Sequence, residues 1–293
     1  MTAEVAVMNS TGVALAADSA VTIGQNATKI YTSAEKLFQL SIAAPVGIMI
    51  YGNASFAGIP WETTIKAYRK KLGAKVFPKI EDYAKDFLSF INRNRKIFPS
   101  TRQDSEVHGL IIRLFLYFRN GMAEKINTEA EQRDGLEEED LPKILDEVIS
   151  ENLRDVKSRA FLPGFSAKDL PAIRRHYSKA ITELKNEIFG NLPFSASTNR
   201  QIITIVIEVL ARDYLGPGKS GVVISGFGQS EYLPSLIHYE FEEMLLNRPR
   251  YAERKSEKLR SEQDASVMAF AQQGRSTGSE GAIADERCAT TPA

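Results

Sequence analysis

The chain opens with MTAEVAVMNSTGVALAADS, residues 1–19, and this stretch decides the fold. Residues 5–7 alternate a valine with a small residue, which is typical of a β-strand. Residues 9–12 have the composition of a turn and residues 13–17 are apolar again, so the stretch predicts a β-hairpin. Asp18 then ends an apolar strand, where a charge is costly unless it has a partner or a task.

Further strands and helices follow this hairpin. A polar loop over residues 19–33 leads to two more expected strands, at 37–40 and 46–51. Apolar residues at helical spacing predict helices over residues 60–72, 80–96, 141–156, 172–189 and 201–214. Residues 107–118 are almost continuously apolar, so periodicity alone fits a helix or a strand, and the length of the segment favours a helix.

The last third of the chain predicts a second hairpin, at residues 222–228 and 234–241, followed by a charged, helix-prone run over residues 250–262. Just before it, residues 216–220 read Gly-Pro-Gly-Lys-Ser. A phosphate-binding loop would need a glycine where Asp213 stands and a strand before the loop, so we interpret this segment as a helix-to-strand turn.

Composition narrows the function. The 293 residues carry a formal net charge of zero, which gives no global attraction to nucleic acid or to an anionic membrane. The single cysteine, Cys288, excludes a disulfide framework, and the three histidines (His108, His176 and His238) lie too far apart for a local metal motif. With no signal peptide and no apolar run near ~18 residues, we expect a cytoplasmic protein without a cofactor or a metal.

The opening pattern resembles the proteasome β-subunit type of N-terminal-nucleophile hydrolase. In that family a mature N-terminal Thr precedes a first strand, a Gly turn and a second strand that ends in Ala-Ala-Asp-Ser. Here Thr2 stands sixteen residues before Asp18, which is the family spacing. The family lysine matches Lys36 best, after a two-residue insertion, and Lys29 is the alternative. The likeness covers about the first 70 residues and returns more weakly near residues 200–241.

The resemblance implies an α+β fold, a four-layer α-β-β-α sandwich with antiparallel sheets. Residues 1–273 would form one domain carrying a helical insertion at about 75–195. Residues 274–293 are rich in Ser, Thr, Gly, Ala and Pro and are expected to be disordered. The family needs further helices and strands after the second hairpin. The sequence pattern does not provide them, so either the sandwich is incomplete at its C-terminus or the fold closes differently.

The resemblance also implies a chemistry. Once Met1 is removed, the Thr2 hydroxyl would be the nucleophile and its α-amine the base. Lys36 would lower the pKa of the hydroxyl, and Asp18 would pair with that lysine. A backbone amide near Tyr51-Gly52 would stabilise the oxyanion; the family glycine could match either position, and Gly52 is favoured. The expected partner is a peptide or other amide substrate, and the expected assembly is a homo-oligomer.

A second hypothesis is a non-catalytic scaffold or regulatory subunit of the same fold. The family places a Gly-Ser-Gly turn beside the nucleophile, whereas Gly226-Phe227-Gly228 lacks the serine. Retention of Thr2, Asp18 and Lys36 favours the hydrolase, and the missing serine favours the scaffold. The state of the N-terminus separates the two, because a chain that keeps Met1 has no Thr2 amine to use.

Overall fold

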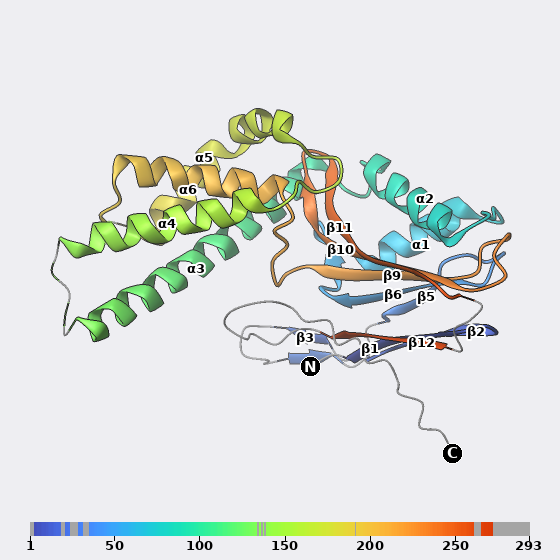
Figure 1. The fold of residues 1–293 in the computed structure, drawn as a ribbon. Coiled ribbons are helices and arrows are strands. Elements are labelled where there is room, and N and C mark those ends of the chain that lie inside the picture. Colours follow the sequence, from blue (N-terminus) through green and yellow to red (C-terminus); the bar gives the residue numbers. More distant parts are fainter. Residues whose placement is uncertain are drawn as a thin grey trace, which may run out of the picture.

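The computed structural model describes residues 3–18, 21–23, 29–31, 35–133, 135, 137, 139–190, 192–260 and 265–271. Within these residues the chain has a mixed α/β fold, and its strands pair in antiparallel fashion. Figure 1 shows two stacked sheets, helices above the upper sheet and a lobe of longer helices to one side. The predicted mixture of helices with antiparallel sheets is therefore confirmed.

The N-terminal hairpin forms as predicted, with β1 (Ala3–Asn9) paired to β2 (Gly12–Ala17). The Asn9 side-chain oxygen accepts hydrogen bonds from the backbone N–H groups of Thr11 (3.0 Å) and Gly12 (2.8 Å), which fixes the turn. On the other edge of β1 lies β12 (Ala265–Ala271), the last described strand, so the order in this sheet is β12-β1-β2.

The second sheet has five strands in the order β11-β10-β9-β6-β5. They are β5 (Leu37–Gln39), β6 (Val46–Gly52), β9 (Ser220–Gly226), β10 (Ser235–Leu245) and β11 (Arg248–Lys258). β9 and β10 form the second predicted hairpin. β6 pairs with β9, although all the described helices lie between these two strands in the sequence. Two short pairs are β3 (Val21–Ile23) with β4 (Lys29–Tyr31) and β7 (Ser55–Phe56) with β8 (Ile59–Pro60).

Two apolar layers hold the sheets and helices together. Between the sheets, Ala6 and Met8 of β1 are buried with Met49, Tyr51, Val223, Leu236, Met268 and Phe270. The other face of the five-stranded sheet packs against α1 (Trp61–Leu72) and α2 (Ile80–Arg93). There the Trp61 ring lies 5.3 Å from the Phe241 ring of β10.

The remaining helices form a lobe with a core of its own. They are α3 (Ser100–Gln132), α4 (Asp140–Ser158), η1 (Ala167–Asp169), α5 (Leu170–Phe189) and α6 (Ala196–Ala211). The ambiguous segment 107–118 is helical, as its length predicted. α2 packs on the five-stranded sheet and belongs to its core. The separate core of the lobe is formed by helices α3 to α6. None of the helices in the described ranges is long and apolar enough to span a membrane.

The prediction of a helix-prone run at residues 250–262 is wrong, because most of this run is strand β11. Two of its cations, Arg250 and Arg254, pair with carboxylates of the adjacent strand. Arg250 is fully buried and meets the Glu242 carboxylate of β10 at 3.0 Å, and Arg254 meets the Glu240 carboxylate at 2.7 Å. The chain also supplies the further strands that the sequence pattern did not reveal, since β11 and β12 both follow the second hairpin.

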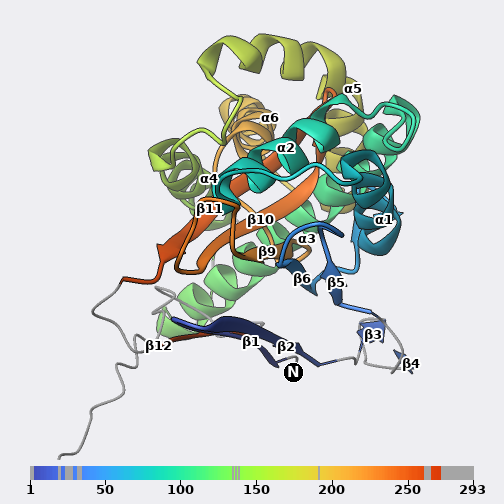
Figure 2. The same ribbon diagram turned by 90° about the vertical axis from the view of Figure 1, so that its right-hand side faces the viewer.

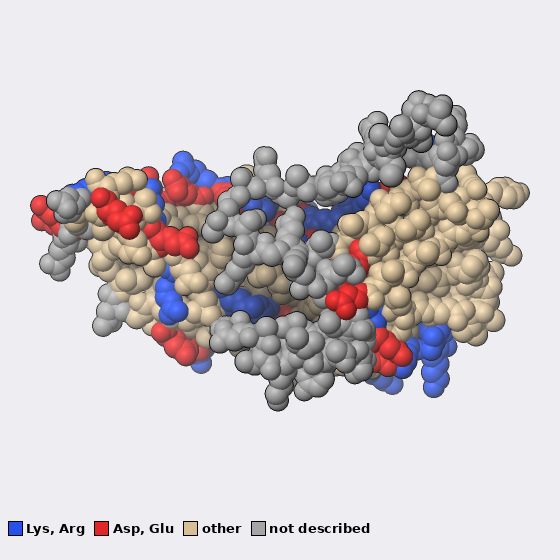
Figure 3. Space-filling model, turned by 90° about the horizontal axis from the view of Figure 1, so that it is seen from below, with Lys and Arg blue, Asp and Glu red and all other residues tan. Residues whose placement is uncertain are grey.

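The outer face of the three-stranded sheet has no helix against it in the described part of the chain (Figure 2). Seen from below, this face is an area without charged side chains (Figure 3). Val7 and Val267 on this face are 37% and 67% exposed. The described layers are thus one helical layer and two sheets. The predicted disorder of residues 274–293 lies outside the described residues.

Candidate functional site

Strand ends from both sheets meet at one end of the space between the sheets. In the register of the smaller sheet, Glu4 at the start of β1 faces Ala17 at the end of β2 and Phe270 near the end of β12. In the larger sheet the Lys36 carbonyl, just before β5, accepts a 2.8 Å hydrogen bond from the Ile50 amide near the end of β6. The pairing of strands therefore brings residues 4, 17–18, 36 and 50–52 to the same end.

A buried ion pair connects the two sheets at this end. The Lys36 ammonium lies 3.1 Å from Oε1 of Glu4. Glu4 is 1% exposed and Lys36 is 9% exposed, so both charges are removed from water. Burial raises the pKa of the Glu4 carboxyl, the hydrogen bond and charge of Lys36 oppose that rise, and the negative charge of Asp18 adds to it.

The predicted site residues have different outcomes. Asp18 follows β2 and acts electrostatically on Glu4, which in turn holds Lys36, so these three side chains belong to one cluster. The predicted Asp18–Lys36 pair remains a prediction. Lys29, the alternative lysine, lies in β4, and Thr2 lies outside the described residues, directly before Ala3 of β1.

Gly52 closes strand β6 in a conformation that glycine favours. Its φ is +74°, and a Cβ built there would lie 2.6 Å from the Lys219 carbonyl oxygen. Any larger residue would both strain the backbone and collide with β9. The strand consequently ends in a turn whose backbone can approach other groups closely.

Behind the ion pair, Tyr51 and His238 form a buried hydrogen bond, with the phenol oxygen 2.6 Å from Nε2. Burial lowers the pKa of His238 to about 4, so the imidazole is neutral at neutral pH. Burial also raises the pKa of Tyr51, to which the charges of Glu240 and Glu4 add. The Phe270 ring packs on both, with centroids 5.9 Å from Tyr51 and 5.0 Å from His238.

A charged network continues from this layer toward the helical lobe. The Glu240 carboxylate meets the Lys219 ammonium at 2.6 Å and the Arg254 guanidinium at 2.7 Å. Arg254 also grips the Asp213 carboxylate with two hydrogen bonds, of 2.6 and 2.7 Å. Burial of Glu240 opposes ionisation, yet Lys219 and Arg254 outweigh it and lower the pKa of Glu240. This network is internally balanced, since two cations meet two anions.

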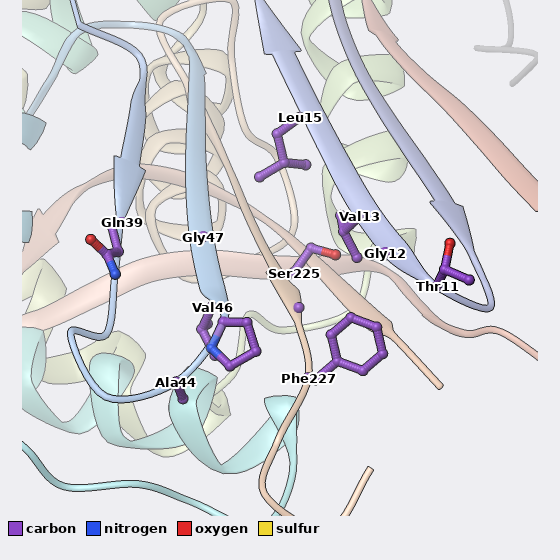
Figure 4. Close-up of a pocket in the computed structure, with 12 residues that line it drawn as sticks. Thr11, Gly12, Val13, Leu15, Gln39, Ala44, Val46, Gly47, Ser225 and Phe227 are labelled. Atoms are coloured by element: carbon purple, nitrogen blue, oxygen red, sulfur yellow. The ribbon is translucent and has the colours of Figure 1, made fainter. Parts of the chain in front are cut away.

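A cavity of about 450 Å³ lies at the opposite end of the inter-sheet space (Figure 4). Its walls are the β1–β2 turn and the ends of β6 and β9 nearest to it, with Leu15, Ser225 and Phe227 among the lining residues. Because Asn9 and Gly12 pair at the turn whereas Glu4 and Ala17 pair at the far end, this cavity is separate from the Glu4–Lys36 cluster.

At the end of the inter-sheet space that holds the Glu4–Lys36 ion pair, the sequence analysis did not identify Glu4 or His238. Glu4 had a readable signal, because it shares the inward face of β1 with Ala6 and Met8, where a carboxylate is unexpected. Tyr51 and His238 are 187 positions apart in the sequence, so no local sequence pattern predicts their contact. Across the described ranges, no group of three or more His, Cys, Asp or Glu residues is placed to hold a metal ion.

Comparison with known proteins gives no further constraint: no protein-family model, curated protein or solved structure matches this chain.

Proposed function

We propose that this protein is a threonine-type N-terminal-nucleophile hydrolase that cleaves peptide or other amide bonds after Met1 is removed. The proposal includes the fold: the two stacked sheets would be the central layers of a four-layer sandwich, with α1 and α2 as one outer layer. It extends to the homo-oligomeric assembly that the proteasome resemblance implies.

The observation that supports it is the buried ammonium of Lys36 at the start of β1. It is held by Glu4, two residues after Thr2 in the chain, and Asp18 lies close to the same carboxylate. Removing an ammonium from water is costly, and ionisable groups in such surroundings are enriched at functional sites.

The proposed reaction uses the two functional groups of Thr2. Its hydroxyl attacks the carbonyl carbon of the amide, and its α-amine takes the hydroxyl proton. The oxygen of the tetrahedral intermediate is stabilised by the backbone at Gly52. The protonated α-amine then returns the proton to the leaving nitrogen, the C–N bond breaks, and an ester remains on Thr2. Water, deprotonated by the same amine, hydrolyses this ester and regenerates the hydroxyl.

In this reaction Lys36 acts through its charge. An ammonium close to the hydroxyl favours the developing alkoxide, which lowers the energy of the attack. Asp18 and Glu4 would keep that ammonium in place. The α-amine suits the role of base because its reference pKa, near ~7.7–8.0, lies close to neutral pH.

One observation favours the scaffold alternative. The Glu4 carboxyl lies 3.1 Å from the Lys36 ammonium, and its negative charge weakens the field that a nucleophile would feel. The Gly226-Phe227-Gly228 turn also lacks the serine of the family pattern. A subunit that only assembles with others would tolerate both features.

Two measurements separate the functions. Intact mass spectrometry of the purified chain should show loss of Met1. Incubation with a panel of peptides bearing an aminocoumarin amide should then release the fluorophore, and the Thr2→Ala variant should lose about 10³-fold or more of that rate, as removal of a nucleophile does. A chain that keeps Met1, or a Thr2→Ala variant with the rate of the unaltered protein, contradicts the hydrolase.

A further inference from the structure

We propose that Glu4 is a positioning residue of the site, and that it holds the Lys36 ammonium in the inter-sheet space. The proposal rests on the proposed function for its catalytic meaning, whereas the contact itself stands on geometry. The sequence pattern assigned the holding of Lys36 to Asp18, and the structure points to a second carboxylate from β1.

The backbone fixes Glu4 firmly. It is the second residue of β1, paired on one side with Ala17 of β2 and on the other with Phe270 of β12. Its side chain shares the inward face with the buried Ala6 and Met8. A carboxylate held by two neighbouring strands in the core has little freedom to move, so it can define where the Lys36 ammonium lies.

The ion pair is less satisfied than a purely structural one in the same molecule. Arg250 is also fully buried, and its guanidinium donates to the Leu210, Val209 and Tyr214 carbonyls as well as to Glu242. By contrast, Oε2 of Glu4 is buried with no hydrogen-bond partner, and Lys36 donates one hydrogen bond among the described residues, to Glu4.

This difference identifies the role of the pair. A buried carboxylate oxygen without a partner destabilises the fold, because the group has lost its hydration. An ammonium can donate three hydrogen bonds. Within the described part of the chain, the Glu4–Lys36 pair therefore has acceptor and donor capacity to spare at the end of the sheets where β1 begins, whereas Arg250 uses its donors within the fold.

The charges around Glu4 also set its effect on the site. Among the described residues, the titratable groups that act on Glu4 or feel its charge include Lys36, Asp18 and Tyr51. The cluster thus combines two carboxylates with one ammonium. The excess negative charge favours protonated amines nearby, so removal of Glu4 should make a base at this end available at lower pH.

The first test reads the position of Lys36 without using activity. Amines are labelled with acetic anhydride in the full-length protein, and the acetylation rate of Lys36 is divided by that of Lys179, which is 89% exposed. In Glu4→Gln the ratio should rise about tenfold, the factor that corresponds to 1.4 kcal/mol. The control Glu62→Gln, which removes the partner of the exposed Lys66, should leave the Lys36 ratio unchanged.

The second test separates positioning from a purely structural role. A peptide epoxyketone is added, since its ketone can take a hydroxyl and its epoxide an amine of one N-terminal residue, and the adduct-forming rate is followed from pH 5 to 9. In Glu4→Gln the acidic limb of this profile should move to lower pH. Glu4→Asp keeps the charge, so its limb should stay near that of the unaltered protein. If the Gln variant unfolds, the labelling test uses Glu4→Asp, whose shorter side chain cannot keep the 3.1 Å contact, so the Lys36 ratio should rise there too and an unchanged ratio overturns the proposal.

An unchanged Lys36 labelling ratio in Glu4→Gln overturns the proposal. A Gln variant that reacts more slowly at every pH, with its limb in place, also overturns it and leaves a structural ion pair. Failure of the hydrolase itself looks different: Thr2→Ala would then react with the epoxyketone as fast as the unaltered protein, whatever the labelling shows.

Discussion

At the scale of single residues, Glu243 resembles Glu4 in being a buried carboxylate with one oxygen that has no hydrogen-bond partner. It lies in the irregular part of β10 between Phe241 and Met244, has a φ of +57°, is 6% exposed, and leaves Oε2 without a partner. Burial raises its pKa to about 7, the charge of Glu106 adds to the rise, and Arg113 opposes it. Glu242 and Arg250 also act on it, in opposite directions.

This shift predicts a pH-dependent stability. The folded Glu243 keeps its proton up to about pH 7, whereas in the unfolded chain the carboxyl has its ordinary pKa of 4.5 and loses the proton above it. The penalty for the buried charge therefore grows from pH 4.5 to 7 and then stays constant. Relative to the unaltered protein, Glu243→Gln should be more stable by about 2–3 kcal/mol at pH 8, and the gain should vanish near pH 4.5. Urea unfolding at each pH measures this gain.

The control for that experiment is Glu183→Gln, since the Glu183 side chain is 65% exposed. Its unfolding free energy should follow the unaltered protein at every pH. A gain for Glu243→Gln that is independent of pH would show that the folded carboxyl ionises normally.

The Tyr51–His238 hydrogen bond gives a second prediction at this scale. Tyr51→Phe removes the phenol oxygen and leaves the His238 Nε2 buried without its partner. The unfolding free energy at pH 7.5 should fall by about 1–3 kcal/mol. Tyr232→Phe is the matched control, because Tyr232 is 96% exposed, and it should change stability by less than about 0.5 kcal/mol. Equal urea midpoints for the two variants would contradict the contact.

The sequence predicted part of the residue-scale picture. Asp18 and Lys36 were singled out by the family resemblance, with Lys29 as the alternative lysine, and Asp18 and Lys36 belong to the same cluster in the structure. Glu4 was not predicted because the sequence analysis used Val5 and Val7, whereas Glu4 lies on the opposite, inward face of β1 with Ala6 and Met8. Residues such as His238 meet their partners only through strand order, which no local pattern contains.

At the scale of elements, apolar runs and turn residues were good guides and charged runs were not. The two hairpins, the helices and the rejection of a phosphate loop before β9 followed from periodicity and turn chemistry. β11 was misread because a run rich in Arg, Glu and Lys is typical of a solvated helix. Its cations instead pair with Glu240 and Glu242 of the adjacent strand, and such pairing depends on the register of β10 and β11.

The register of β12 on β1 can be tested with adjacent residues. Met268 faces the inter-sheet core and is 6% exposed, whereas Val267 faces outward and is 67% exposed. Met268→Lys should lower the unfolding free energy by about 3 kcal/mol or more, since an unpaired charge enters the core. Val267→Lys should stay within about 0.5 kcal/mol of the unaltered protein. Thermal unfolding of both variants tests this prediction. An equal loss of stability in the two variants would contradict the register.

At the scale of the whole molecule, the fold joins a stacked pair of sheets to a helical lobe. The sequence predicted both parts, because the strand-rich segments bracket a helix-rich middle. It did not predict the boundary between the two apolar cores. Helix α2 belongs to the core of the sheets, and α3 is the first helix in the core of the lobe. It also did not predict that β12 completes the smaller sheet, since the pairing of the last described strand with the first is a long-range contact.

The central claim is that the chain uses Thr2 as an N-terminal nucleophile beside the Lys36 cluster. Intact and peptide-level mass spectrometry after incubation with the peptide epoxyketone tests it most directly. We expect a chain without Met1 that gains the mass of one reagent molecule, with the adduct on residue 2, and no gain in Thr2→Ala. A chain that retains Met1, or an adduct that persists in Thr2→Ala, would contradict the claim.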